Sequence, residues 1–218
     1  MLNRTLKIAA AAVRTRMSFY SKHILPWFID LAMKNPATTE CRSHIVPRAV
    51  GRVLDVGIGS GLNLRFYGPR VTKLWGIDPS SELLEMARSK VKSVPFPVEL
   101  LAHSAEEIPL PQRSIDTIVL TWTLCSIPNP IQALREMRRV LRADGQVVFA
   151  EHGLSPDPGV QVWQRRLNPI WRRIAGGCNM NRKIDDLLLA GGFKMAELST
   201  SYFPGPKILT YTHQGLAV

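Results

Sequence analysis

The sequence predicts an open α/β fold built around a mostly parallel sheet. From about residue 50 to residue 150, short apolar runs alternate with segments of helical periodicity. Strands that are separated by helices pair in parallel through right-handed crossovers. A glycine-rich turn follows the first apolar run, at the carboxyl end of a strand, where sheets of this kind bind ligands. The 218 residues suffice for one domain with a hydrophobic core and additional helices.

The elements are expected in a regular order along the chain. Helical periodicity dominates the first 50 residues, with breaks expected at Pro26, Pro36 and Pro47. Five apolar runs predict five strands, at 52–56, 73–77, 96–101, 115–121 and 146–150. Between them, helices are expected over 80–92 and 130–142, and Gly145 is expected to end the second one.

After Gly145 the pattern changes. A proline-rich loop leads into a basic, aromatic-rich helix over 160–174, and a second helix is expected over 181–190. Two closing strands are expected at 193–203 and 207–217. The chain is therefore expected to form a single domain in four parts: a helical N-terminal extension (1–50), a ligand-binding core (51–152), a helical cap (153–192) and the closing strands (193–218).

The bulk composition is that of a soluble globular protein, with 45% hydrophobic and 21% charged residues. The three cysteines stand far apart without a CxxC pair, which argues against a disulfide framework or a local zinc motif. Few and scattered cysteines fit a reducing compartment, so a cytoplasmic location is expected. No window approaches 18 uninterrupted apolar residues, and no membrane span is expected.

The net charge of +11 is unevenly distributed. Residues 1–29 and 158–184 carry several basic side chains, and the sequence has no acid in 158–184 and none in 1–29. Both stretches are expected to attract an anion, whether nucleic acid, anionic lipid or an acidic substrate. No nucleic-acid recognition module is visible beyond the charge. The first 17 residues have the pattern of a basic amphipathic helix, which fits contact with the anionic cytoplasmic face of a membrane, an organelle transit peptide, or packing on the domain itself.

The most informative run is RVLDVGIGSGLNL, which contains Asp55, Gly57, Gly59 and Gly61. The dinucleotide pattern G-x-G-x-x-G needs its third glycine at position 62, where this chain has Leu62. A nicotinamide cofactor is therefore disfavoured. With an acid two residues before the first glycine, the run resembles motif I of the class I S-adenosyl-L-methionine (SAM) methyltransferases. The resemblance implies that the loop backs the methionine part of SAM and that Asp55 lies near its amino group.

An acid follows the second predicted strand in the run LWGIDPS. Asp78 stands 21 positions after Gly57, where a carboxylate accepts hydrogen bonds from both ribose hydroxyls of a bound nucleoside. An acid there supports SAM and NAD alike. The alternative role for Asp78 is to cap the helix expected over 80–92.

The adenine end of the cofactor site is expected in AHSAEEIPLP. The resemblance places Ser104, Ala105 and Glu106 there, although many relatives have Asp-Ala at this point. Glu106 or the backbone around Ala105 is then expected to replace the aspartate. Thr121, which ends the fourth predicted strand, completes the cofactor-binding set.

Longer segments resemble one particular family. LCSIPNPIQALREMRRVLRADGQVVFAEHG, LNPIWRRIAGGCNMNR and GPKILTYTHQGLAV are similar to the membrane-associated alkyl thiol S-methyltransferases and their bacterial relatives, from about residue 45 to the C-terminus. The resemblance implies a Rossmann-like, seven-stranded sheet with its last strands antiparallel and a helical insertion before them. It also implies SAM as the cofactor, S-adenosyl-L-homocysteine as the product, a thiol substrate and no metal. Asn168 stands where many relatives have an acid.

The run TWTLCSIPNP (121–130) lies at the expected mouth of the site and lacks an obvious base. The sulfonium of SAM already activates its methyl group, so the enzyme mainly holds donor and nucleophile together in a dry site. A thiol, with a pKa of about 8.5, ionises with little help. His152, after the fifth strand, is the expected catalytic acid–base group; its alternative is a purely structural hydrogen bond.

Three further residues are assigned to the substrate side of the site. Cys125 and Cys178 are expected near the acceptor, although isolated cysteines also serve as small buried apolar residues, and arsenite methyltransferases use cysteine thiolates as ligands. Trp163 is expected to contribute to an apolar lid. A SAM-dependent N-, O- or C-methyltransferase acting on a membrane-dissolved lipid or quinone precursor remains the alternative function.

Overall fold

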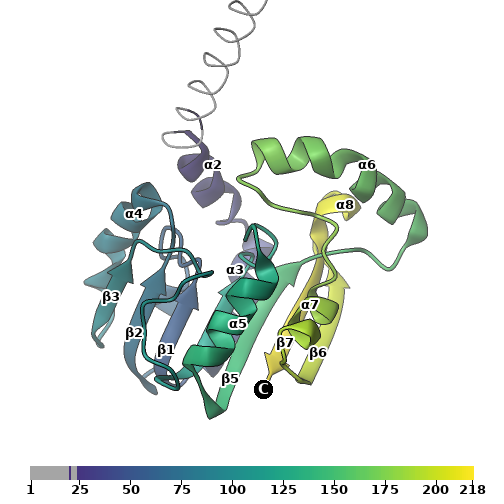
Figure 1. The fold of residues 1–218 in the computed structure, drawn as a ribbon. Helices are drawn as coiled ribbons and strands as arrows, with labels where there is room; N and C mark the ends of the chain where they lie inside the picture. Colours follow the sequence, from purple (N-terminus) through teal and green to yellow (C-terminus); the bar gives the residue numbers. More distant parts are fainter. Residues whose placement is uncertain (1–19, 21–23) are drawn as a thin grey trace, which may run out of the picture.

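The computed structural model describes residue 20 and residues 24–218, and its centre is one seven-stranded sheet (Figure 1). The strand order is β3-β2-β1-β4-β5-β7-β6. All pairings are parallel except those of β7, which runs antiparallel to both neighbours. The predicted mostly parallel sheet with antiparallel closing strands is confirmed. The strands are β1 (Gly51–Val56), β2 (Val71–Ile77), β3 (Val98–Leu101), β4 (Ile115–Thr121), β5 (Leu141–His152), β6 (Met195–Tyr202) and β7 (Tyr211–Ala217).

Helices cover both faces and one end of this sheet. Figure 1 shows α2 and α6 at the end where the parallel strands finish, whereas α5 lies along the sheet. The helices are α2 (Leu25–Ala32), α3 (Pro36–Ile45), α4 (Ser81–Val91), α5 (Pro130–Val140), α6 (Pro158–Ile174), α7 (Ile184–Ala190) and α8 (Lys207–Thr210), with single turns η2 (Val46–Arg48) and η3 (Leu64–Phe66).

Burial on both faces of the sheet explains why the central strands appear in the sequence as continuous apolar runs. In β4, five of the seven residues form an unbroken buried run at its carboxyl end, because helices cover the sheet on both sides. The strand order reverses beside β1, which has β2 on one side and β4 on the other. The loops after β1 and β4 therefore diverge, and they leave a crevice between them at the carboxyl edge.

Several boundaries differ from the sequence prediction. The helical pattern is interrupted as expected near Pro36, which begins α3 after α2 has ended at Ala32, and near Pro47, which lies in η2 directly after α3. Pro26 stands in the first turn of α2, where a backbone N–H has no partner within the helix. Helix α5 ends at Val140 rather than near residue 142, and Gly145 lies inside β5 instead of terminating the helix. The reason is Leu141, whose buried side chain joins the core as the residue pairs with Ile115 of β4.

The closing strands are also shorter than expected, because the short helix α8 separates β6 from β7. The expected basic amphipathic helix over the first 17 residues lies outside the described residues. Within the described part of the chain, no helix is long and apolar enough to cross a membrane. The division of the domain into four parts stays a prediction.

Candidate cofactor and acceptor site

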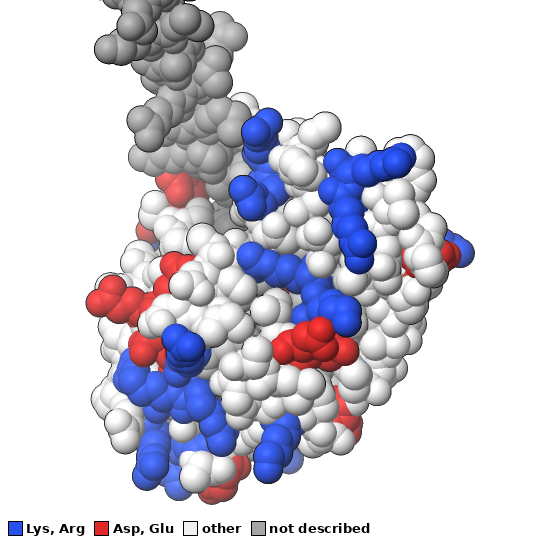
Figure 2. Space-filling model, turned by 45° about the vertical axis from the view of Figure 1, so that its right-hand side comes forward, with Lys and Arg blue, Asp and Glu red and all other residues white. Residues whose placement is uncertain are grey.

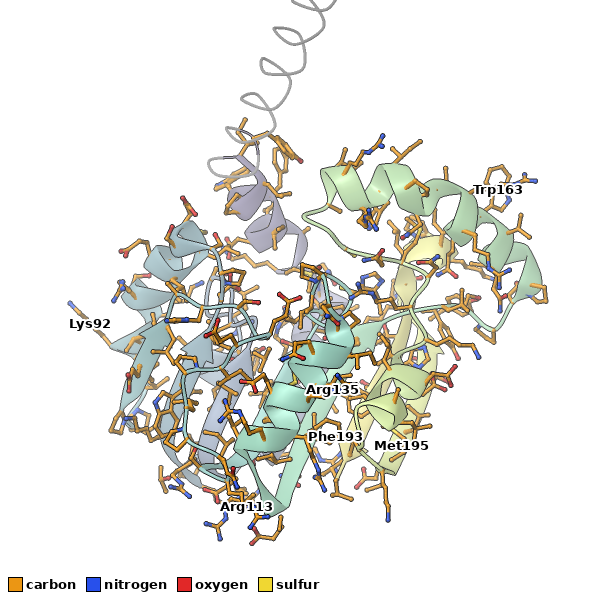
Figure 3. All side chains as sticks on the ribbon, in the orientation of Figure 1. Lys92, Arg113, Arg135, Trp163, Phe193 and Met195 are labelled. Atoms are coloured by element: carbon orange, nitrogen blue, oxygen red, sulfur yellow. The ribbon has the colours of Figure 1, made fainter. Side chains whose placement is uncertain are left out.

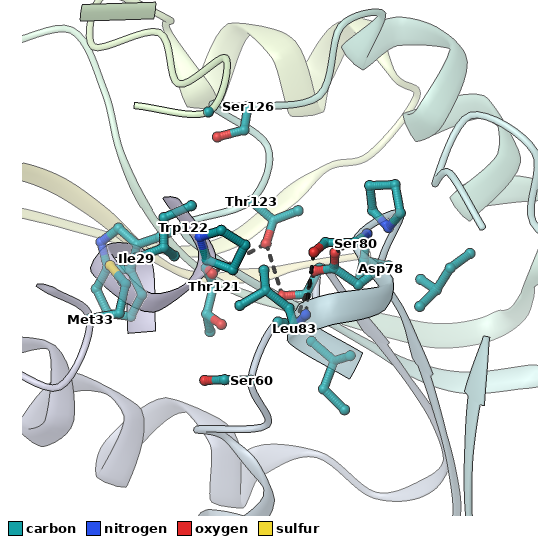
Figure 4. A pocket seen from close by; sticks show the side chains of 18 of the residues that line it. Ile29, Met33, Ser60, Asp78, Ser80, Leu83, Thr121, Trp122, Thr123 and Ser126 are labelled. Atoms are coloured by element: carbon teal, nitrogen blue, oxygen red, sulfur yellow. Dashed lines mark hydrogen bonds between the residues drawn. The ribbon is translucent and has the colours of Figure 1, made fainter. Parts of the chain in front are cut away.

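A cavity of about 310 Å³ opens at the carboxyl ends of the central strands (Figure 4). One wall is the glycine loop after β1, and a second is formed by the segments that follow β2, β3 and β4. Helix α2 and the segment directly after α6 cover the remaining side. The cavity is lined by Leu25, Pro26, Ile29, Asp30, Met33, Arg42, Val56, Gly57, Ile58, Gly59, Ser60, Leu62, Asn63, Ile77, Asp78, Pro79, Ser80, Leu83, Ser104, Ala105, Thr121, Trp122, Thr123, Ser126, Ile127, Pro128, Ala175 and Gly176.

The glycine loop needs its glycines for two separate reasons. At Gly57 the backbone has φ +68°, and a Cβ would lie 2.2 Å from Oγ1 of Thr123. At Gly61, with φ +78°, a Cβ would lie 3.2 Å from the Cβ of Ala87 on α4. Side chains at these positions would strain the left-handed turn and force the loop away from its neighbours. The loop can therefore approach both a bound molecule and the following helix closely.

Asp78 connects the glycine loop to the start of α4. Its two carboxylate oxygens accept hydrogen bonds from the backbone N–H of Gly59 at 3.0 Å and of Ser80 at 2.8 Å. Burial raises the pKa of Asp78, and these two N–H donors act in the opposite direction. The helix cap is Ser80, whose Oγ accepts from the backbone N–H of Leu83. Asp78 therefore lines the cavity with spare acceptor capacity for ribose hydroxyls.

Asp55 lies behind the cavity wall rather than in it. Its carboxylate is fully buried and accepts hydrogen bonds from Nδ2 of Asn63 at 3.1 and 3.0 Å. Nε of Arg42 donates in turn to Oδ1 of Asn63 at 3.1 Å. Burial raises the pKa of Asp55 to about 7, opposed by Asn63 and by the charge of Arg42. Asn63 and Arg42 line the cavity, and neither was predicted from the sequence.

Helix α2 is held to the glycine loop by Asp30. The Ser60 hydroxyl donates to one carboxylate oxygen at 2.5 Å, and Lys34 Nζ donates to the other at 2.5 Å. Lys90 Nζ donates to the carbonyl of Ser60 and lies 3.9 Å from Asp30. Burial opposes ionisation, but these partners lower the pKa of Asp30 overall. Asp30 was not predicted as a site residue, although it is the sole acid among the first 39 residues.

Of the three residues predicted at the adenine end, two line the cavity and one lies outside it. Ser104 and Ala105 line the cavity, but Glu106 does not. The Glu106 carboxylate accepts from the Ser104 hydroxyl at 3.1 Å and from the backbone N–H of Asn129 at 2.6 Å. It therefore fastens this loop to the start of α5. Thr121 lines the cavity and accepts a hydrogen bond from Nδ2 of Asn63.

The base-poor loop after β4 owes its shape to Glu151. This fully buried carboxylate accepts the backbone N–H of Thr123 at 2.6 Å and of Leu124 at 2.9 Å. Burial raises the pKa of Glu151 to about 7, and the backbone donors lower it in part. Trp122, which precedes these donors, has φ +53°, a rare backbone conformation for a bulky residue. Glu151 thus stabilises a strained loop that forms one wall of the cavity.

His152, Cys125 and Cys178 come together behind that loop. Their ligand atoms lie within 4.8 Å of one another, and Nε2 of His152 is 2.9 Å from Sγ of Cys178. None of the three lines the cavity. Burial opposes the charged imidazole, but Cys178 and Glu151 raise the pKa of His152 overall. Cys125 and burial raise the pKa of the Cys178 thiol well above its ordinary range.

Trp163 lies apart from the other assigned residues. Its side chain is 53% exposed on α6, and Figure 3 shows it projecting away from the body of the sheet. The residues that cover the cavity from the cap are instead Ala175 and Gly176, directly after α6. The structure therefore brings together most of the predicted cofactor residues and the cysteine–histidine group, but leaves Trp163 outside.

Known proteins are similar to this chain in sequence. Residues 54–149 match the methyltransferase domain family. The chain is 32% identical over 136 residues to the thiol S-methyltransferase TMT1B of Rattus norvegicus, covering 60% of this chain and 55% of that protein. It is 41% identical over 112 residues to a phosphatidylethanolamine N-methyltransferase of Cereibacter sphaeroides, covering 50% and 54%. The chain thus spans little more than half the length of these relatives.

The fold has counterparts among solved structures. A SAM-dependent methyltransferase of Leishmania major superposes with a TM-score of 0.68 over 94% of this chain and 82% of that one. At 15% sequence identity this likeness shows the fold alone. The sheet order, the glycine loop with Asp78 at the crevice, and the domain match agree with one another. Residues 54–149 therefore form a methyltransferase domain of the class I SAM-dependent type.

Proposed function

We propose that this protein transfers the methyl group of SAM to the sulfur of a small or lipophilic thiol. The observation that carries the proposal is the lack of a poised base in the cavity wall. In the part of the chain that the structure describes, the acids lining the cavity are Asp30 and Asp78, and no histidine or cysteine lines it. Both carboxylates already accept two or more hydrogen bonds. Such a site suits a nucleophile that ionises without help.

The cofactor-side residues support the placement of SAM. Gly57 and Gly59 allow the backbone to approach the methionine part, and Asp78 offers acceptors to the ribose. Ser104 and Ala105 line the expected adenine end. In this arrangement Asp55 acts indirectly, because its carboxylate accepts from Nδ2 of Asn63 and so fixes that side chain in the cavity wall.

The acceptor is expected at the side walled by Ile29, Met33, Trp122 and Ser126 (Figure 4). A largely apolar wall excludes water and favours in-line approach of a thiolate. Bound SAM would supply the activated methyl group: the thiolate sulfur would bond to the methyl carbon as the sulfonium C–S bond broke, which would leave S-adenosyl-L-homocysteine. The thiol proton passes to solvent. The expected role of His152 as proton acceptor stays a prediction, because Nε2 faces Cys178.

The similarity to a thiol S-methyltransferase supports this acceptor. The second candidate is N-methylation of an aminophospholipid, which the similarity to a phosphatidylethanolamine N-methyltransferase favours. Exposed apolar side chains on α2, next to the cavity, suit a lipophilic substrate in either case: Trp27, Phe28 and Leu31. These side chains also support the proposed peripheral contact with an anionic membrane at its cytoplasmic face.

A nucleic-acid substrate is less well supported than either candidate. A protein that binds the phosphate backbone carries Lys and Arg in a continuous patch or stripe. On the face that Figure 2 shows, the basic side chains are spread over separate regions with acids between them. Salt-dependent binding of RNA or DNA would be needed to revive this alternative.

The test is methyl transfer from isotopically labelled SAM to a panel of sulfide, an alkyl thiol, phosphatidylethanolamine vesicles and a quinol. Label in a thioether supports the proposal. Label in the lipid, with none in thiols, overturns it in favour of the second candidate, and label in the quinol alone overturns both. Asp78→Asn should slow transfer at subsaturating SAM at least tenfold through weaker SAM binding, and the exposed Asp144→Asn serves as its matched control.

A further inference from the structure

A group of three soft donors lies one layer behind the cavity wall. Cys125 stands in the loop after β4, His152 at the end of β5, and Cys178 between α6 and α7. Residues up to 53 positions apart in the sequence thus converge, and their donor atoms lie within 4.8 Å of one another. Neither cysteine forms a disulfide. This convergence is invisible to an analysis of local spacing, which predicted no metal.

We propose that Cys125, His152 and Cys178 are ligands of one zinc ion. Two thiolates and an imidazole are a known donor set for zinc, which leaves a fourth position free. Tetrahedral zinc with the usual bond lengths separates its sulfur and nitrogen donors by about 3.5 Å. Nε2 of His152 and Sγ of Cys178 are 2.9 Å apart, so small side-chain rotations suffice.

The surroundings of the group fit a cation of charge +2. Nε1 of Trp171 donates a hydrogen bond to Sγ of Cys178 at 3.3 Å, the type of contact that stabilises a metal-bound thiolate. Arg182 interacts electrostatically with both cysteines and with Glu151. Two thiolates balance the charge of the zinc ion, and the guanidinium balances the buried carboxylate. The whole cluster is then neutral, as a buried group requires.

Zinc would join the helical cap to the core beside the acceptor end of the cavity. Sγ of Cys125 lies 3.5 Å from Oγ of Ser126, which lines the cavity. On the other side, Gly176 lines the cavity two residues before Cys178. The ion therefore fixes two segments of the cavity wall. Zinc coordination of His152 replaces its acid–base role, and the site does not depend on which acceptor is methylated.

The test begins with the full chain, purified under reducing conditions and stripped with a chelator. Co²⁺ is then titrated as a spectroscopic probe and displaced with Zn²⁺. One equivalent of Co²⁺ with thiolate-to-metal charge-transfer absorption, displaced by one equivalent of Zn²⁺, supports the site. Cys125→Ser and Cys178→Ser should remove most of this absorption. Cys41→Ser should keep the absorption, because Cys41 lies on α3, outside the group, and its thiol donates a hydrogen bond to Gln214.

Two results would overturn the proposal. One is wild-type protein that binds S-adenosyl-L-homocysteine in calorimetry but gives no charge-transfer absorption with Co²⁺. The other is a Cys125–Cys178 disulfide, mapped by mass spectrometry of protein purified without reductant, in place of bound metal. Both results come from the wild-type chain, so they hold even where a variant fails to fold. Neither measurement involves a methyl acceptor, so the zinc proposal is tested independently of whether the protein methylates thiols.

Discussion

Nδ2 of Asn63 lies 3.1 and 3.0 Å from the two carboxylate oxygens of Asp55. The amide therefore shields a fully buried carboxylate from the cavity and presents its own oxygen to Arg42. A motif acid that is expected to face the cofactor is thus one residue removed from it. The amide, rather than the acid, forms the surface at this point of the cavity.

Asn63→Ala is expected to lower the free energy of unfolding by about 1–3 kcal/mol, because it leaves Asp55 buried without its donor. Urea denaturation measures this loss. Asn181→Ala, at a partly exposed position, provides the matched control and should stay within about 0.5 kcal/mol of the wild type. Equal losses in the two variants would contradict the shielding role of Asn63.

Asp78→Asn is expected to weaken binding of S-adenosyl-L-homocysteine at least tenfold, since the side chain loses one acceptor oxygen and its charge. Hydrogen bonds to a charged group contribute about 1.5–3 kcal/mol each, which corresponds to that factor or more. Calorimetric titration measures the affinity. The prediction fails if the affinity stays within twofold of the wild type while Asp144→Asn behaves identically.

Gly57→Ala is expected to destabilise the fold by about 2–4 kcal/mol, from the left-handed backbone and from overpacking against Thr123. Gly68→Ala is its control, because a Cβ there meets no atom within 4 Å. Adding Thr123→Ala to Gly57→Ala should restore part of the stability in thermal denaturation. If the double variant melted at the same temperature as Gly57→Ala alone, contact with Thr123 would not be the cause of the destabilisation.

The stability of the protein should depend on pH through Asp55. Burial raises its pKa from 3.8 to about 7, so folding favours the protonated carboxyl. The resulting stabilisation is fully present below about pH 4 and is lost as the pH rises through about 7. Asp55→Asn is expected to flatten the decline in unfolding free energy across this window. Glu151, whose pKa is also raised to about 7, retains a residual slope.

Urea titrations across that pH window measure the slope. Asp186→Asn, at an exposed position on α7, should keep the slope of the wild type. The assignment to Asp55 would be contradicted if the unfolding free energies of the wild type and of Asp55→Asn changed with pH to the same extent. In that case the pKa of Asp55 would be the same in the folded and the unfolded protein.

The sheet could be predicted because its buried strands are uninterrupted apolar runs, as in β4. The boundary at Leu141 could not, since a leucine suits both the end of a helix and the start of a strand, and pairing with Ile115 decides between them. The glycine loop and Asp78 follow from local spacing alone. Asp30 and Arg42 reach the same cavity from α2 and α3, so only the packing of those helices reveals them.

The position of β7 between β5 and β6 has a consequence for biosynthesis. Ribosomes produce β6 before β7, yet β7 is the one strand of the described sheet with which β6 pairs. Until residues 211–217 emerge, the nascent chain therefore presents the unpaired edge of β5 together with an unattached β6. Exposed strand edges of this kind pair readily with other chains. Synthesis of residues 211–217 thus closes an interval in which this protein is prone to associate wrongly.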